Sequence, residues 1–76
     1  MVEKRIIDAR GSFCPGPLME LIAGLKMMQV GDEAEVLSTD KGSANDIPEW
    51  VKKVGHAHLG TREEGNVWHV TVRKMK

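Results

Sequence analysis

The chain has 76 residues, of which 41% are apolar and 29% are charged, with eleven basic and eleven acidic side chains. This length suits one small domain with a single core, so we expect residues 1–76 to form one unit. The charges balance, and only Phe13, Trp50 and Trp68 are aromatic. The chain therefore lacks both the basic field and the stacking platform that direct binding of nucleic acid needs, and it lacks the charge that attracts anionic lipid.

Cysteine usage and hydropathy indicate the compartment. The single cysteine, Cys14, cannot form an internal disulfide, which favours a reducing environment. The N-terminal stretch is charged and lacks the apolar segment of a signal peptide, and no apolar run has the length that crossing a bilayer requires. We therefore expect a cytoplasmic protein.

The first half of the chain predicts a strand, a helix and a second strand. Residues 4–9 form a short apolar run typical of a strand. From Pro15 to about Met28, apolar residues recur at helical spacing, and Gly31 follows as the expected end of that helix. The apolar face of this helix consists of Leu18, Leu21, Ile22 and Leu25. Residues 33–39 predict a second strand with Ala34 and Val36 on its buried side.

A second helix is predicted to end at Gly55, with Ile47, Trp50 or Val51, and Val54 as its apolar positions. Its beginning depends on Pro48, which has no backbone N–H to donate within a helix. We expect Asp46 to be the N-terminal cap, because Pro48 then lies in the first turn, where no donor is needed.

The remaining residues predict a hairpin, because two runs of alternating polarity flank the turn at Glu64-Gly65-Asn66. The register about this turn sets Arg62 opposite His69. Trp68, Val70 and Val72 are predicted to face inward, with His69, Thr71 and Arg73 on the opposite side. The order β-α-β-α-β-β predicts an α+β two-layer sandwich: a four-stranded mixed sheet with both helices on one face.

The position of Cys14 indicates an activated thiol. It directly precedes the predicted start of the first helix, whose positive end favours thiolate over thiol. We expect Pro15 to occupy the first helical position, and Gly16 to leave the sulfur accessible. Because Pro17 has no N–H, the amides of Gly16 and Leu18 are the candidates to donate hydrogen bonds to the sulfur.

Several reactions remain open for such a thiol. No second cysteine is present for dithiol exchange within the chain. A single accessible thiolate can still accept a sulfane sulfur and pass it on as a persulfide. The structural alternative is that Cys14 fills space beside Phe13, as buried free cysteines do.

A resemblance to a known family bears on this choice. The sequence "DARGSFCPGP", residues 8–17, resembles the signature of the TusA/SirA-type sulfur-carrier family, in which a Cys-Pro-x-Pro motif opens the first helix. The family's second element, an aspartate after the second strand followed by Asp-Ile-Pro-x-Trp, matches Asp40 and residues 46–50. The resemblance covers essentially the whole chain and implies the same sandwich fold.

The resemblance also implies a function and the residues that perform it. Cys14 would carry sulfur as a persulfide between proteins, for thiolation of transfer RNA, molybdenum-cofactor maturation or sulfur-energy metabolism. The supporting motif residues would be Asp8, Arg10, Gly11, Pro15, Gly16, Pro17, Asp40 and Asp46.

One loop departs from the family pattern. Many members have proline directly after the aspartate that ends strand two, whereas this chain has Lys41. The fold should place this loop near Cys14, where the ammonium of Lys41 would favour an anionic sulfur species. An anionic cargo, a thiosulfonate on Cys14, is therefore a further hypothesis, which incubation with thiosulfate or tetrathionate would test.

Other residues allow two interpretations each. Phe13 and Met19 form either an exposed apolar rim for docking a partner or ordinary packing, and Arg10 either steers acidic partners or is simply solvated. His56, His58 and His69 could suggest a metal site. In the predicted register, however, His58 lies roughly 13 Å along the strand from His69, at about 3.3 Å per residue. No closed metal site forms at that separation, so we expect a solvated sheet face.

The sequence thus favours a sulfur-relay carrier that needs no cofactor or metal and is transferase-like in its chemistry. Its partners would be a donor, such as a cysteine desulfurase or rhodanese-like protein, and an acceptor protein. A small neutral carrier that docks several partners is expected to be a monomer. The alternatives are an adaptor module without sulfur chemistry, or a redox sensor that forms intermolecular disulfides.

Overall fold

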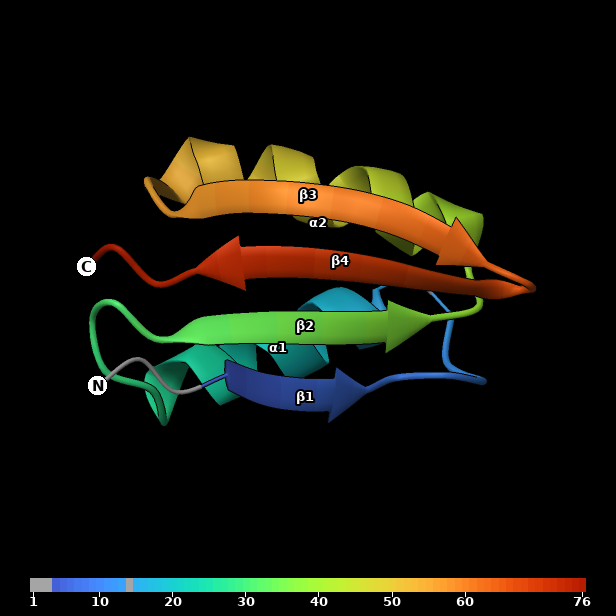
Figure 1. The fold of residues 1–76 in the computed structure, drawn as a ribbon, viewed down its shortest axis with the longest axis horizontal. Coiled ribbons are helices and arrows are strands. Elements are labelled where there is room, and N and C mark those ends of the chain that lie inside the picture. The colour runs from blue at the N-terminus through green and yellow to red at the C-terminus, as the bar shows by residue number, and fades with distance from the viewer. Residues whose placement is uncertain (1–3, 14) are drawn as a thin grey trace.

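A computed structural model describes residues 4–13 and 15–76. Six elements follow one another in the chain (Figure 1): β1 (Lys4–Asp8), α1 (Gly16–Lys26), β2 (Glu33–Ser38), α2 (Lys41–Val54), β3 (Ala57–Glu64) and β4 (Val67–Arg73). The order β-α-β-α-β-β is the predicted one. Neither α1 nor α2 has both the length and the apolar character that a membrane-spanning helix requires.

The four strands form one mixed sheet in the order β1-β2-β4-β3. β1 and β2 are parallel, whereas β4 is antiparallel to both of its neighbours. Figure 1 shows both helices behind the sheet, so one face is covered and the other carries no helix. The predicted α+β two-layer sandwich is confirmed.

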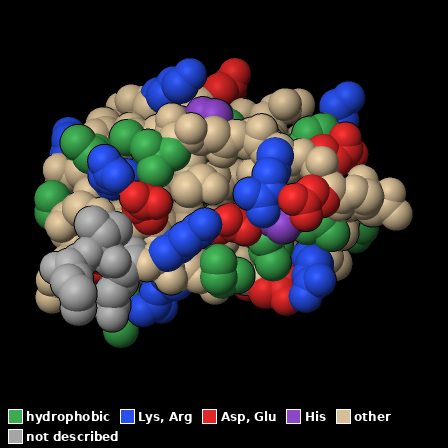
Figure 2. Space-filling view, viewed as in Figure 1, with side chains coloured by type: hydrophobic (Ala, Val, Ile, Leu, Met, Phe, Trp, Pro, Cys, Tyr) green, Lys and Arg blue, Asp and Glu red, His purple; other side chains and the backbone are tan. Residues whose placement is uncertain are grey.

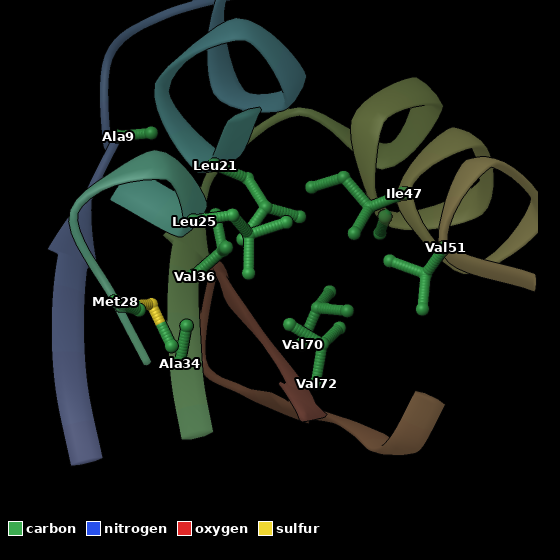
Figure 3. Close-up of a cluster of buried hydrophobic side chains, with 11 residues drawn as sticks. Ala9, Leu21, Leu25, Met28, Ala34, Val36, Ile47, Val51, Val70 and Val72 are labelled. Carbon is green, nitrogen blue, oxygen red and sulfur yellow. The ribbon is translucent and has the colours of Figure 1, made fainter. Parts of the chain in front are cut away.

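The core lies between the sheet and the two helices (Figure 3). Ala34, Val36, Val70 and Val72 are fully buried on the inner face of the sheet, opposite Leu21 of α1 and, from α2, Ile47 and Val51. This burial confirms the predicted inward positions of both central strands. Trp50 and Trp68 are partly buried and pack against this core. Since a buried aliphatic side chain contributes about 1.5–3 kcal/mol, this cluster supplies the main driving force for folding.

α1 is shorter than its apolar pattern predicted. It ends at Lys26, and the amides of Met27 and Met28 donate to Gly24 and Leu25, closing the last turn tightly. Gly31, the expected end of this helix, instead forms a left-handed turn just before β2, with φ of 97°. The prediction failed because Met28 is buried and apolar although it lies outside the helix.

A lysine from the end of the chain completes the C-terminus of α1. The Lys74 ammonium donates to the carbonyl oxygens of Leu25, at 2.6 Å, and of Met28, at 2.8 Å. The last carbonyls of a helix have no partner within the helix and carry partial negative charge, so a cation is well placed there. The residue that follows β4 therefore holds the end of α1.

The predicted start of α2 was wrong. The helix begins at Lys41, its N-cap is Asp40 rather than Asp46, and Pro48 lies within it. The early turns are retained because their inner face is buried: Ser43, Ala44 and Ile47 are each at most 5% exposed. Burial of these side chains offsets the hydrogen bond that Pro48 cannot donate. The C-terminus is as predicted, because Gly55 is the left-handed cap, with φ of 94°.

The hairpin has the predicted register, with Arg62 opposite His69. The turn contains Gly65, whose φ is 60°. Near its start, however, β3 has an irregularity that the sequence pattern did not predict. The register shifts between His58 and Gly60, and Leu59 is 45% exposed there. Such a bulge interrupts the regular ladder at this edge of the sheet.

The helix-free face carries charges of both signs in close contact (Figure 2). Glu35 is buried there; its carboxylate contacts the Lys4 ammonium and His69 Nδ1, both at 2.9 Å. Hydrogen bonds from His69, and then from Lys4, lower the pKa of Glu35 below its ordinary value. On the same face Arg73 pairs with Glu33 at 2.8 Å. The expected solvated sheet face is therefore a network of ion pairs, in which the side chain of His69 is only 14% exposed.

Candidate functional site

The two loops that precede α1 and α2 lie at the same end of the sheet. Because β1 and β2 are parallel, the segment from β1 to α1 and the segment from β2 to α2 both leave from carboxyl ends of strands, at the arrowheads on the right of Figure 1. A hydrogen bond joins them: the amide of Gly11 donates to Thr39 Oγ1 at 3.1 Å. Cys14 itself lies outside the described residues, so the site is built from its neighbours.

The segment before Cys14 is held by several local contacts. Arg10 donates to Asp8 through its main-chain N–H, at 3.1 Å, and through Nε and Nη2, at 2.9 and 2.7 Å. These bonds hold the pKa of Asp8 at about 2, below its ordinary 3.8. Ser12 donates to the Ala9 carbonyl at 3.1 Å, and Gly11 is left-handed, with φ of 85°. Asp8 and Arg10 thus contact each other and brace the turn, and both remain about half exposed.

Residues on the C-terminal side of Cys14 differ from the prediction by one position. Pro15 is the N-cap rather than the first helical residue; Gly16 begins α1, and Pro17 is buried in the first turn. The amide of Gly16 donates to the Phe13 carbonyl at 2.6 Å; the expected donation from Gly16 and Leu18 to the Cys14 sulfur falls outside the described residues. A Cβ at residue 16 would lie 3.2 Å from Ser12 Cβ, which gives glycine a packing role here.

The N-terminus of α1 carries little to offset its positive end. No side chain of the described residues caps it, and its first turn contains no acidic residue. The partial positive charge of a helix N-terminus stabilises a nearby anion. This end of the helix is therefore suited to negative charge.

The two residues of the expected apolar rim are exposed. Phe13 is 76% exposed and Met19 is 57% exposed, one on each side of the start of α1 in the sequence. Large exposed apolar side chains are typical of surfaces that dock a partner. Packing in the core is excluded for both, while the partner-docking role stays a prediction.

The second loop has a structural role that the sequence interpretation only partly anticipated. The Asp40 carboxylate accepts from the Ser43 amide at 3.1 Å and from its hydroxyl at 2.9 Å, which caps α2. Lys41 is the exposed first residue of that helix, and Asp46 is exposed in its interior. Thr39 was missed as the link between the loops; its position at the end of the predicted second strand was the available signal.

The three histidines have separate roles. His69 contacts Glu35 on the helix-free face, and His58 Nε2 lies 2.7 Å from Thr61 Oγ1. His56 Nδ1 accepts from the main-chain N–H of Met75 at 3.0 Å. Within residues 4–13 and 15–76, no group of three His, Cys, Asp or Glu side chains is arranged to hold a metal ion.

Known proteins are similar to this chain in both fold and sequence. The crystal structure of the SirA-like protein from Desulfitobacterium hafniense has a TM-score of 0.82, covering 93% of this chain and 97% of that chain. The sequences are 22% identical, so this similarity establishes the fold. Residues 5–74 match the family model described as sulfurtransferase TusA, and the chain therefore belongs to the TusA family.

Individual relatives agree with this assignment. A protein of Archaeoglobus fulgidus, provisionally named a sulfur carrier protein, is 55% identical over 71 residues, which are 93% of this chain and 97% of the relative. The sulfur carrier protein TusA of Allochromatium vinosum is 32% identical over 68 residues, which cover 90% of each chain. The sequence-based assignment to the TusA/SirA type is confirmed.

Proposed function

We propose that the chain relays sulfur, with Cys14 as the residue that carries it. The Cys14 thiolate attacks the outer sulfur of a donor persulfide. A bond forms between the two sulfurs as the donor's sulfur–sulfur bond breaks, and the donor leaves as a thiolate. Cys14 then bears a persulfide, and an acceptor thiolate attacks its terminal sulfur in the same way, which restores the Cys14 thiolate. No external oxidant or reductant is required.

Membership of a family whose relatives are named sulfur carriers is the observation that carries this proposal. The local chemistry supports it, because Cys14 directly precedes the N-cap Pro15 of a helix without an acidic residue in its first turn. A helix N-terminus is a recurrent setting for a cysteine with a lowered pKa. The bonded loop before Cys14, with Gly11 held by Thr39, limits the motion of the segment that presents the thiol.

The second loop supports the hypothesis of an anionic cargo. Lys41 is exposed at the start of α2, in the loop region joined to the Cys14 segment through Thr39. With tetrathionate, the Cys14 thiolate would attack a central sulfur and release thiosulfate, leaving a thiosulfonate on Cys14. An ammonium group nearby would stabilise this anion more than it would a neutral persulfide.

Docking of donor and acceptor proteins is assigned to the apolar rim formed by Phe13 and Met19. Both side chains are exposed beside the start of α1, where a partner must approach to reach Cys14. We further propose that the carrier acts as a monomer in the cytoplasm, without a cofactor, since the exchange needs only two thiols in contact.

Intact-mass spectrometry after incubation with a persulfide donor or tetrathionate tests the chemistry. The expected result is a gain of one sulfur atom, or of one thiosulfonate group, that is reversed by a thiol reductant and absent in Cys14→Ser. An unmodified wild-type chain would favour an adaptor role, and a Cys14-linked dimer as the only product would favour a redox sensor.

A second experiment separates docking from chemistry. Phe13→Ser should slow loading from a rhodanese-like or desulfurase donor at least about fivefold, because exposed apolar anchors contribute to protein interfaces. Loading from tetrathionate should be unchanged. Val30→Ser is the matched control, since Val30 is 64% exposed elsewhere on the surface. Equal slowing by both variants would contradict the assignment of the rim.

A further inference from the structure

The strand at one end of the sheet has an open edge. β1 is the first strand in the order β1-β2-β4-β3, so no neighbouring strand lies along its other side among the described residues. The Ala9 amide donates to the Leu37 carbonyl of β2. Because main-chain groups alternate along a strand, the amides of Ile7 and Arg5 also point toward β2. Lys4, Ile6 and Asp8 therefore direct their main-chain groups outward, where a further strand could bind.

A groove runs beside this edge. Gly24 allows α1 to approach β1 closely, since a Cβ at this residue would lie 2.8 Å from Ile7 Cδ1. The groove measures about 410 Å³, and two of the residues that line it are largely exposed, Met27 at 74% and Ile6 at 54%. Its lining residues are Arg5, Ile6, Ile7, Glu20, Ala23, Gly24 and Met27.

We propose that a second copy of this chain binds here, with the two β1 strands antiparallel about a two-fold axis at Ile6. In this register Ile6 faces its counterpart, and Lys4 of each copy faces Asp8 of the other. The two sheets become one continuous sheet, and each groove faces the groove of the second copy. A two-fold interface must be self-complementary, and the sequence Lys-Arg-Ile-Ile-Asp of β1 meets this condition.

The charges on both faces of the sheet favour this partner. On the helix-free face, Lys4 pairs with Glu35 and Asp8 pairs with Arg10 within one chain. The Lys4 and Asp8 side chains are nevertheless 50% and 51% exposed, so each can also approach the opposite charge across the axis. On the helix side, Arg5 and Glu20 form no ion pair with any described residue of their own chain. α1 runs antiparallel to β1, so Glu20 lies toward the Asp8 end and Arg5 toward the Lys4 end. The two-fold axis brings Arg5 of one copy to Glu20 of the other.

The interface is small, because β1 has only five residues. Small interfaces are typical of reversible association. We therefore infer a dimer that forms as concentration rises, in exchange with the monomer that was proposed as the carrier. This inference does not depend on sulfur chemistry at Cys14, and its test measures association alone.

Charge reversal combined with sedimentation velocity tests the dimer over a series of protein concentrations. Arg5→Glu and Glu20→Arg should each weaken dimerisation about tenfold, because two symmetric attractions become repulsions. The double variant should restore the wild-type dissociation constant. Lys53→Glu, with the same charge change on the exposed side of α2, should leave it unchanged. A wild-type chain that is monomeric at every concentration overturns the proposal, as does a double variant without recovery.

Cross-linking tests the register. In a Cys14→Ser background, Ile6→Cys places two thiols across the axis, where opposed residues have Cα atoms about 5.5 Å apart, a separation that suits a disulfide. Mild oxidation should give a covalent dimer at least about tenfold faster than it does for Lys53→Cys in the same background. Equal rates would show random collision and would refute this register.

Discussion

Lys74 should stabilise the domain more than its surface position suggests. Its ammonium donates to two main-chain carbonyls at the end of α1, those of Leu25 and Met28, and it is partly buried. Hydrogen bonds to charged groups contribute about 1.5–3 kcal/mol, and the helix dipole adds up to about 1 kcal/mol. Because water can replace part of these interactions with the carbonyls in the variant, Lys74→Met should lower the free energy of unfolding by about 2 kcal/mol.

Urea unfolding followed by tryptophan fluorescence measures this loss, at a protein concentration low enough to keep the chain monomeric. A thermal scan should show Tm lower by about 10 °C, from the usual 4–8 °C per kcal/mol for domains of this size. The matched control is Lys52→Met, the same substitution in the last turn of α2, where the side chain is exposed. If the two variants lose equal stability, the interaction of Lys74 with α1 is not the cause and the reasoning fails.

Three further predictions test other parts of the structure. Asp40→Ala should lower the free energy of unfolding by about 1 kcal/mol through loss of the cap on Ser43, while Asp40→Asn should retain most of it; equal losses would contradict the capping role. Hydrogen bonds lower the pKa of Glu35 from its ordinary 4.5, so this carboxylate stabilises the fold above pH 4.5 and stops doing so as pH falls through its lowered pKa. Glu35→Gln should flatten that part of the stability–pH curve, and an unchanged slope would exclude the ion-pair network as its source. Burial lowers the pKa of His56 below 6.5, so stability should fall as pH drops from 6.5 toward that lowered value. His56→Asn should remove this dependence while still accepting from Met75, and persistence of the dependence would assign it to another group.

Where sequence periodicity and turn residues act together, the fold could be predicted closely. The inward positions Val70 and Val72, and the pairing of Arg62 with His69, followed from alternation and from the turn at Gly65-Asn66. The beginning of α2 could not be predicted in this way. The helix starts at Lys41 because Ser43 and neighbouring residues are buried against the sheet. This tertiary effect outweighs the local cost of Pro48.

Contacts between residues distant in the chain could not be predicted from sequence patterns either. Lys74 is 46 residues from Met28 in the chain, and Glu35 is 34 residues from His69. Each pair depends on a strand neighbour or a helix end that only the assembled fold supplies. For the candidate site, the motif around Cys14 pointed to the family, whereas the hydrogen bond from Gly11 to Thr39 could be found only from the structure.

Because of the bulge at Leu59, the β3 edge of the sheet is less able than the β1 edge to pair with a further strand. Strand addition needs a regular row of main-chain donors and acceptors, which β3 interrupts between His58 and Gly60. A pair of chains joined through β1 would then expose a β3 strand at each of its two ends, and each β3 is irregular between His58 and Gly60. The break near the start of β3 makes a third copy less able to join there than a second copy is at β1, which favours pairs of chains over longer assemblies.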